Sequence, residues 1–419
     1  MFAASGSPVS RHAVAFVLVT VFLDMVGFGL ITPVLPALIE EVGHVGLDRA
    51  SVLGGWMFAA FSVAQFAFAP LAGNLADRFG RRPLLLIAIF GLGADFALSA
   101  WAPTLTWLFV GRILTGVCGS SWVIASAYLT DITAPENRAR AFGWLTATYG
   151  LGFIIGPAVG GILGEFGPRV PFWAAAALSL VNFLYGWAVL PESLPAASRR
   201  PFSLVRSNPF GTFAVFRNYP GVLPLCLVLA FYFFITAVYP AIWSFWGIAR
   251  FGWSEAVIGL TLMAYGIVTA FFQGTLTGVF VRRFGEHRTV VIGLACSAIA
   301  ATGYGLAGSL VAVLLLTLAH GPEGFVHPLL TAMLTRRVPE NAQGELQGGI
   351  SAMLNIAMLG GTVFFAQVFG WFMAPGRDWT SPSLGFLISG VGIVLTLGLY
   401  LFVDRGAPGC DVAEREEAA

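Results

Sequence analysis

Residues Gly73–Pro83 read GNLADRFGRRP and place one acid and three arginines between two long apolar runs. A shortened copy stands in the second half, where Gly278–Gly285 reads GVFVRRFG and repeats the RFG of the first stretch. At the same offset, Gly156 is matched by Gly361. The chain is therefore predicted to consist of two related halves. In a membrane protein, two such halves around one pocket are typical of a carrier that opens to one side at a time.

The composition excludes an ordinary soluble domain. Of 419 residues, 57% are hydrophobic and 10% are charged, and the mean hydropathy is +0.83. A soluble chain of this length could not hide so much apolar surface from water, so a lipid bilayer is the expected surrounding. The net charge of +1 argues against nucleic acid as a partner. The spread of the four cysteines predicts neither a disulfide framework nor a metal site, and no cofactor is expected.

Roughly twenty apolar residues cross a bilayer as a helix, and this length divides the chain into spans. The predicted fold is an all-α membrane protein of twelve transmembrane helices in two pseudo-symmetric six-helix bundles. The spans are expected near 13–37, 50–71, 83–102, 106–130, 138–163, 171–190, 220–247, 255–280, 288–307, 310–335, 344–372 and 383–403.

Arginines concentrate in alternate loops, which by the positive-inside rule face the cytoplasm. This pattern puts both termini inside the cell and the chain in a plasma (bacterial inner) membrane. The segment between the sixth and seventh spans is rich in Pro, Ser and Arg and links the halves. The predicted domains are a bundle at 1–190, a cytoplasmic linker at 191–219, a second bundle at 220–403 and a cytoplasmic tail at 404–419. A monomer is expected, because one chain contains both halves of a pocket.

Together, the repeated six-span pattern and the charged loop after the second span resemble the major facilitator superfamily over nearly the whole chain. Arg112 lies in a GRILTG stretch similar to that family's span 4 motif. The first span, DMVGFGLITPVLP from Asp24 to Pro36, is similar to that of the tetracycline efflux proteins, and Gln65 and Asp95 fall where those proteins have comparable residues. The glycines and proline of span 5 resemble the signature of the family's drug antiporters and are Gly152, Gly156, Pro157, Gly160 and Gly161.

Two positions depart from the tetracycline exporters of Gram-negative bacteria. The resemblance implies a His in span 8 and an acid in span 9 for proton coupling, and this chain has Thr269 and Cys296 there. In span 10 it has His320, Glu323 and His327 instead, around a Gly-Pro-Glu-Gly sequence that is expected to break the helix. The two histidines are seven residues apart and are expected on nearly the same face. A Glu/His proton relay and a pair of packed histidines both fit this pattern.

Ionisable groups inside a bilayer are costly unless paired or hydrated, so they are functional candidates. Asp95 and Arg112 are expected at similar depth, where they could form a coupled pair or a structural salt bridge. Asp24 has no basic neighbour in its own span, which suits a proton carrier, although a hydrogen bond to unwound backbone would also explain it. Gly27, Gly29 and Pro33 are expected to interrupt that helix.

The charged loop after span 2 is expected at the cytoplasmic surface, too far from the bilayer centre to hold cargo. Its residues could latch the halves together through carboxylates such as Asp131, while positive-inside anchoring is the simpler explanation. The gate residues predicted on this ground are Gly73, Asp77, Arg78, Gly80, Arg81, Arg82 and Asp131.

Two other groups of residues complete the candidates. The span 5 glycines recur every four residues and allow another helix to come close, which serves plain packing and a proton-tight seal equally well. Neutral polar residues in the spans, among them Gln65 and Asn355, suggest together with the 14% aromatic content a pocket for an amphiphilic molecule.

The pattern and the resemblance together predict a secondary transporter that exports a drug-like organic compound, with tetracycline as one candidate, in exchange for protons by alternating access. Such drug efflux confers antibiotic resistance. The chain contains no Lys and hence no Gly-x-x-x-x-Gly-Lys nucleotide loop, so an ion gradient is expected to drive transport. A carrier of a metabolite, siderophore or sugar is the alternative. An enzyme, a receptor or a channel fits the short loops and the doubled architecture less well.

Overall fold

A computed structural model describes residues 8–119, 121–202, 211, 213–377 and 379–405 of the 419-residue chain. Within these ranges the regular structure is helical and contains no strand. Eleven helical runs in the described residues are long and apolar enough to cross a membrane. The predicted all-α membrane fold is therefore confirmed. Most of the predicted tail, 406–419, and linker residues 203–210 lie outside the described residues.

The predicted eighth and ninth spans appear as one helical run of 52 residues, Glu255–Leu306. At Gly285 this run leaves helical geometry, with φ 77° and ψ 165°. Gly80, the matching residue of the first copy, also has a positive φ, of 107°. A residue without a Cβ adopts such a φ without strain. The sequence repeat thus returns as the same backbone turn, and twelve spans remain the correct description.

The structure forms two compact units. The first contains residues up to 211 with 239–267 and 362–382, and the second contains 212–238, 268–361 and the residues from 383 onward. The first unit therefore includes parts of three helices that the sequence assigns to the second half. The two compact units therefore have other boundaries than the predicted bundles at 1–190 and 220–403. That division describes the repeated halves of the sequence and stays a prediction.

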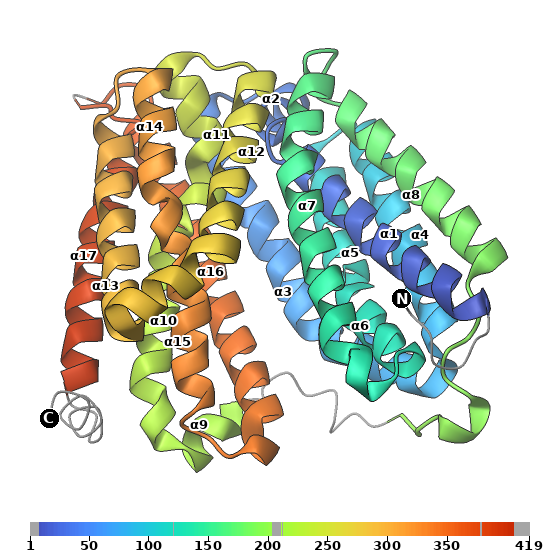
Figure 1. The fold of residues 1–419 in the computed structure, drawn as a ribbon. Helices are drawn as coiled ribbons and strands as arrows, with labels where there is room; N and C mark the ends of the chain where they lie inside the picture. The colour runs from blue at the N-terminus through green and yellow to red at the C-terminus, as the bar shows by residue number, and fades with distance from the viewer. Residues whose placement is uncertain (1–7, 120, 203–210, 212, 378, 406–419) are drawn as a thin grey trace, which may run out of the picture. The chain divides into compact units, whose positions relative to one another are not determined.

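Eight helices make up the N-terminal half of the first unit (Figure 1). They are α1 (Pro8–Ile31), α2 (Leu35–Gly43), α3 (Leu47–Phe79), α4 (Arg81–Trp101), α5 (Leu105–Cys118), α6 (Ser121–Ile132), α7 (Arg138–Gly164) and α8 (Val170–Val189). The later helices are α9 (Ala214–Asn218), α10 (Leu223–Thr236), α11 (Val238–Phe251), α12 (Glu255–Phe271), α13 (Thr277–Leu306), α14 (Leu310–His320), α15 (Val326–Thr335), α16 (Gln343–Met373) and α17 (Leu384–Arg405).

Glycine allows the closest packing in the first unit, where α1 lies along α7 (Figure 1). A Cβ added to Gly156 would lie 2.8 Å from the carbonyl oxygen of Val26 and 2.9 Å from the Cα of Gly29. Gly27 and Gly29 lie inside α1, which ends at Ile31, so the predicted interruption at these glycines is wrong. They serve close approach instead, and the break comes at Pro33.

The opposite face of α7 packs against the start of α12 within the same unit. Gly161 contacts the backbone of Glu255, and Gly259 contacts that of Pro157. Next to these contacts, the Glu165 carboxylate accepts a hydrogen bond from the Ala256 backbone nitrogen at 3.1 Å. Hydrogen bonds from Ser254 and from that nitrogen lower the pKa of Glu165. A carboxylate at a helix start is a favourable cap, since the first N–H groups have no partner in the helix.

In the second unit, α13 packs against α17 and against a short 3₁₀ turn, Gly321–Phe325, that separates α14 from α15. Before α13, the residues Phe272–Leu276 form a π-helical turn that contacts the same 3₁₀ turn. The predicted break at the Gly-Pro-Glu-Gly sequence is therefore present. Two irregular turns meet here, and both lie inside runs that are apolar enough to span a membrane.

Substituting Gly160 with Ala tests the close packing of α1 on α7. Its Cβ would overlap the carbonyl oxygen of Leu30, so we expect a loss of about 1–3 kcal/mol in unfolding free energy. Gly150, ten residues earlier on α7, has nothing within 4 Å of an added Cβ and provides the control. Gly150→Ala should keep or raise stability, because Ala favours helix. Equal effects of the two variants in detergent unfolding would contradict the packing argument.

The Glu165 cap predicts a pH-dependent contribution to stability. Since its pKa in the folded chain lies below the ordinary value of 4.5, the contribution is present above pH 4.5 and is lost as pH falls through the lowered pKa. Glu165→Gln should therefore melt at a lower temperature than the parent chain at pH 7, and the gap should close in acid. A gap of the same size at every pH would contradict the cap.

Candidate functional site

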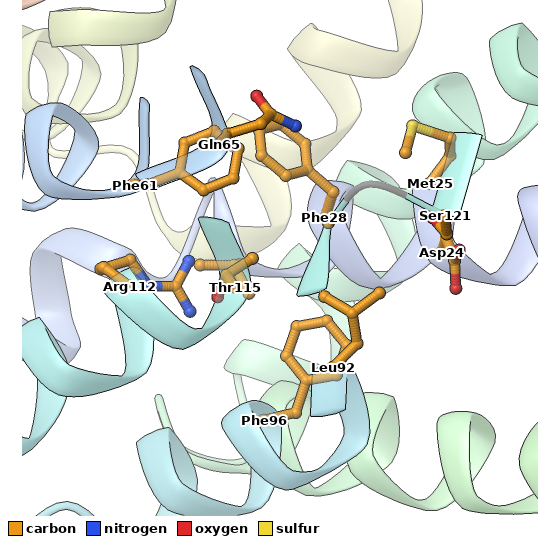
Figure 2. A pocket seen from close by; sticks show the side chains of 12 residues that line it. Asp24, Met25, Phe28, Phe61, Gln65, Leu92, Phe96, Arg112, Thr115 and Ser121 are labelled. Carbon is orange, nitrogen blue, oxygen red and sulfur yellow. The ribbon is translucent and has the colours of Figure 1, made fainter. Parts of the chain in front are cut away.

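A pocket in the first unit lies among α1, α3, α4, α5 and α6 and has an empty volume of about 420 Å³, part of it open to solvent. Asp24, Gln65 and Arg112, all predicted from the sequence, line it. Figure 2 shows the aromatic rings of Phe28, Phe61 and Phe96 around the same space. The pocket therefore combines an apolar aromatic wall with an acid, an amide and a guanidinium.

Asp24 is buried in this wall, with 7% of the residue exposed. Ser121, at the start of α6, hydrogen-bonds its carboxylate, and the two side chains lie side by side in Figure 2. Among the described residues, the second oxygen, Oδ2, has no hydrogen-bond partner. A buried polar atom without a partner carries a desolvation cost. A proton or a donor group of a bound molecule would remove that cost.

Asp95 and Arg112 form a buried ion pair, with 3.2 Å between Oδ2 and the guanidinium. Ser99 donates to Oδ1 at 3.3 Å, and the Thr115 hydroxyl donates to Oδ2. The Asp95 carboxylate is fully buried and has three donors around it. The ion pair and these hydrogen bonds offset the desolvation cost of both charges, and the salt bridge holds α4 to α5. Arg112 also reaches the pocket, so a structural role and a role in transport both remain consistent with the geometry.

A second acid, Glu323, lies partly buried in the second unit, in the 3₁₀ turn of span 10. The Tyr232 hydroxyl donates to Glu323 Oε1 at 2.6 Å, and His320 Nε2 lies 3.1 Å from Oε2. Ser297 on α13 reaches the same His320 nitrogen at 3.3 Å. The cluster formed by Tyr232, Glu323, His320 and Ser297, here called the span 10 cluster, connects three predicted spans. Neither Tyr232 nor Ser297 was predicted.

His327 does not share the face of His320. His320 is fully buried, whereas His327 is exposed and its ring lies 5.3 Å from that of Phe233. The prediction assumed a continuous α-helix, in which residues seven apart nearly align. The 3₁₀ turn at Gly321–Phe325 has about three residues per turn and shifts that alignment. The predicted common face of the two histidines is therefore wrong.

The charged loop after α3 makes its contacts within the first unit, and a latch between the halves stays a prediction. Arg81 lies 2.5 Å from Asp77 and 3.3 Å from Asp131 at the end of α6. Arg82 donates to the carbonyl oxygen of Trp187 on α8 at 2.7 Å. Arg78 stacks over the neighbouring Phe79 ring and is exposed. These contacts hold α3, α4, α6 and α8 together within the first unit.

The beginning of the linker binds the same loop and was not predicted to do so. Glu192 Oε1 accepts hydrogen bonds from the backbone nitrogens of Arg81, at 2.8 Å, and Leu194, at 3.0 Å. Ser193 donates to Asp131, and the Arg200 backbone nitrogen donates to the carbonyl oxygen of Asp77. In the sequence, Glu192 is one acid in a polar segment, and nothing in its local pattern indicates a partner. We call residues 191–200 the linker strap.

The remaining candidates are placed as follows. Gln65 lines the pocket, and Asn355 is exposed on α16 in the second unit. Gly152 and Gly160 face α1, and Gly161 faces the backbone at the start of α12. Gly73 lies near the Val123 side chain with room for a methyl group, whereas an added Cβ at Gly80 would overlap the Glu192 carboxylate.

Replacing Glu192 with Ala tests the linker strap. The Arg81 amide would lose its carboxylate acceptor at the start of α4, an interaction worth about 1 kcal/mol. We expect deuterium exchange in a peptide that covers the start of α4 to become about fivefold faster, as measured by mass spectrometry. Glu136→Ala, an exposed acid in the turn before α7, provides the control and should leave that exchange unchanged. Unchanged exchange in Glu192→Ala would contradict the strap.

Comparisons with known proteins agree with this architecture. The model of the Major Facilitator Superfamily matches residues 17–248 and 225–418. The tetracycline resistance protein of class C from Escherichia coli is 37% identical over 400 residues, which cover 95% of this chain and 98% of that protein. The class G protein from Vibrio anguillarum is 35% identical over 376 residues, which cover 88% of this chain and 93% of that protein.

Among solved structures, the human organic anion transporter MFSD10 superposes with a TM-score of 0.68 at 24% identity. The match covers 94% of this chain and all of that one. The chain is an integral membrane protein that belongs to the major facilitator superfamily and is similar to the tetracycline resistance proteins.

Proposed function

We propose that this protein exports a drug-like, amphiphilic organic compound from the cell in exchange for protons, by alternating access. One observation carries the proposal: an Asp24 carboxylate buried in an aromatic pocket with one oxygen unpaired among the described residues. The near full-length similarity to tetracycline resistance proteins supports the direction and the kind of cargo. The close glycine packing of α7 on α1 is consistent with it.

The mechanism that we propose is competition between proton and cargo. A buried ionised carboxylate attracts a cation or a hydrogen-bond donor, and a protonated carboxylate loses most of that attraction. Proton entry from outside would therefore release cargo, and proton loss to the cytoplasm would restore the binding form. The residues assigned to this exchange are Asp24 in the first unit and Glu323 in the second.

The pocket indicates the chemical class of the cargo. Phe28, Phe61 and Phe96 offer aromatic surface, while Gln65 and Asp24 offer hydrogen-bonding groups. Such a lining suits a flat, amphiphilic molecule with a donor or a positive charge. Tetracycline is the first compound to test, because the relatives' names contain it.

The remaining assignments complete the proposal. The halves at 1–190 and 220–403 are the moving bodies, joined by the linker at 191–219, and the loop at Gly73–Pro83 is the cytoplasmic gate. Asp95 and Arg112 act as a coupled pair beside the pocket. The protein works as a monomer in a bacterial plasma membrane, with both termini in the cytoplasm, and catalyses no chemical reaction.

A panel of toxic compounds that includes tetracycline, tested on cells expressing the chain, would identify the cargo. In inverted vesicles under an imposed pH gradient, we expect accumulation of that compound, which Asp24→Asn and Glu323→Gln should each slow by at least about tenfold, the loss of one good charge interaction. Glu136→Gln, an exposed acid, should transport normally.

Two outcomes would contradict the proposal in different ways. Full transport in both carboxylate variants would overturn the proton assignment and leave export intact. Movement of the compound in the opposite direction, or of a sugar, siderophore or metabolite alone, would overturn the function and leave the family unchanged.

A further inference from the structure

The two oxygens of Glu323 are held from two different helices. Tyr232 on α10 reaches Oε1 at 2.6 Å, and His320 at the end of α14 reaches Oε2 at 3.1 Å. The side chain of Glu323 is 10% exposed, so water does not replace these bonds easily. This acid therefore joins span 7 to span 10 through its carboxylate.

In the part of the chain that the structure describes, titratable groups on three helices surround Glu323. They are Tyr232 on α10, His320 on α14 and Tyr304 on α13, whose ring lies 5.8 Å from the His320 ring. The Tyr304 hydroxyl, however, pairs with Thr317 at 3.2 Å. The Tyr232 hydroxyl bonds directly to the carboxylate.

The strength of this bond depends on the charge of Glu323. A hydrogen bond to an ionised carboxylate is roughly twice as strong as one between neutral groups. When a proton from water adds to one carboxylate oxygen, the group becomes a neutral acid, and the proton later returns to water; no other bond forms or breaks. Tyr232 is therefore held firmly by ionised Glu323 and weakly by the protonated form.

Tyr232 lies close to the end of α10, so a weaker hydrogen bond there affects the last turns of the helix. The Thr236 hydroxyl, one turn later, donates to the Tyr232 carbonyl oxygen, and α10 ends at Thr236. Ala237 interrupts the helix, and the chain passes into the other unit at Tyr239. A contact that loosens at Tyr232 thus acts within two turns of a helix break.

We propose that Tyr232 is a positioning residue that couples the proton on Glu323 to helix α10: ionised Glu323 holds the helix, and protonated Glu323 releases it. This inference rests on the proposed role of Glu323 in proton exchange. It adds to that role the residue that connects Glu323 with α10.

Infrared difference spectroscopy of the purified chain tests this without any cargo. The band of the protonated carboxyl group that disappears in Glu323→Gln reports Glu323 across a pH titration. In Tyr232→Phe we expect its midpoint to move to higher pH by about one to two units, because a hydrogen bond to the charged form has been removed. Tyr304→Phe removes a buried phenol hydroxyl of the same unit that bonds to Thr317, and it should leave the midpoint unchanged.

The outcomes separate the two proposals. If no band within the working pH range disappears in Glu323→Gln, the proton assignment fails, and this inference fails with it. If the band is present but its midpoint is the same in Tyr232→Phe, or moves equally in Tyr304→Phe, only the role of Tyr232 is overturned. Equal melting temperatures of the variants and the parent chain would show that the shift is not a folding defect.

Discussion

Burial of ionisable groups in an apolar surrounding is the constraint on which the other features depend. Each such group needs hydrogen-bond or ion-pair partners, and three acids of this chain differ in how fully their oxygens are paired. Asp95 has Ser99, Thr115 and Arg112 around it, Glu323 contacts Tyr232 and His320, and Asp24 has Ser121 and an oxygen with no partner among the described residues. A satisfied charge stabilises one arrangement, whereas an unsatisfied one favours a change of protonation or of ligand. We therefore assign structure mainly to Asp95 and exchange to Asp24. Both oxygens of Glu323 are paired, and its assignment to exchange rests instead on its contact with Tyr232 beside the end of α10.

Helix geometry positions these groups. Glycines on α7 let α1 come close, and α1 carries Asp24 into the pocket. In span 10, Gly321 and Pro322 give a 3₁₀ turn instead of a continuous helix, and that turn places Glu323 within reach of both Tyr232 and His320. The same turn moves His327 away. Glycine thus has two roles: on α7 it allows another helix to pack closely, and in span 10 it belongs to the turn that breaks the helix.

The spans and the depth of the buried charges could be predicted from the sequence, because both follow from the rise of a helix. This is why Asp95 and Arg112 were expected at one depth, and the structure brings them together. Partners supplied by other helices could not be predicted. Tyr232 is one aromatic residue among many, and Glu192 is one acid in a polar linker, so only tertiary packing shows what they bind. The His327 prediction failed because it assumed an unbroken α-helix where the proline and glycines impose another turn.

Membership of the major facilitator superfamily and the unpaired acid in an aromatic pocket together support a carrier in which proton and cargo compete. The most direct measurement is the number of protons that the purified chain releases when its cargo binds, followed with a pH indicator in weak buffer. We expect proton release by the parent chain and none when Asp24 and Glu323 are both neutralised to their amides. Cargo that binds the parent chain without releasing a proton would contradict it.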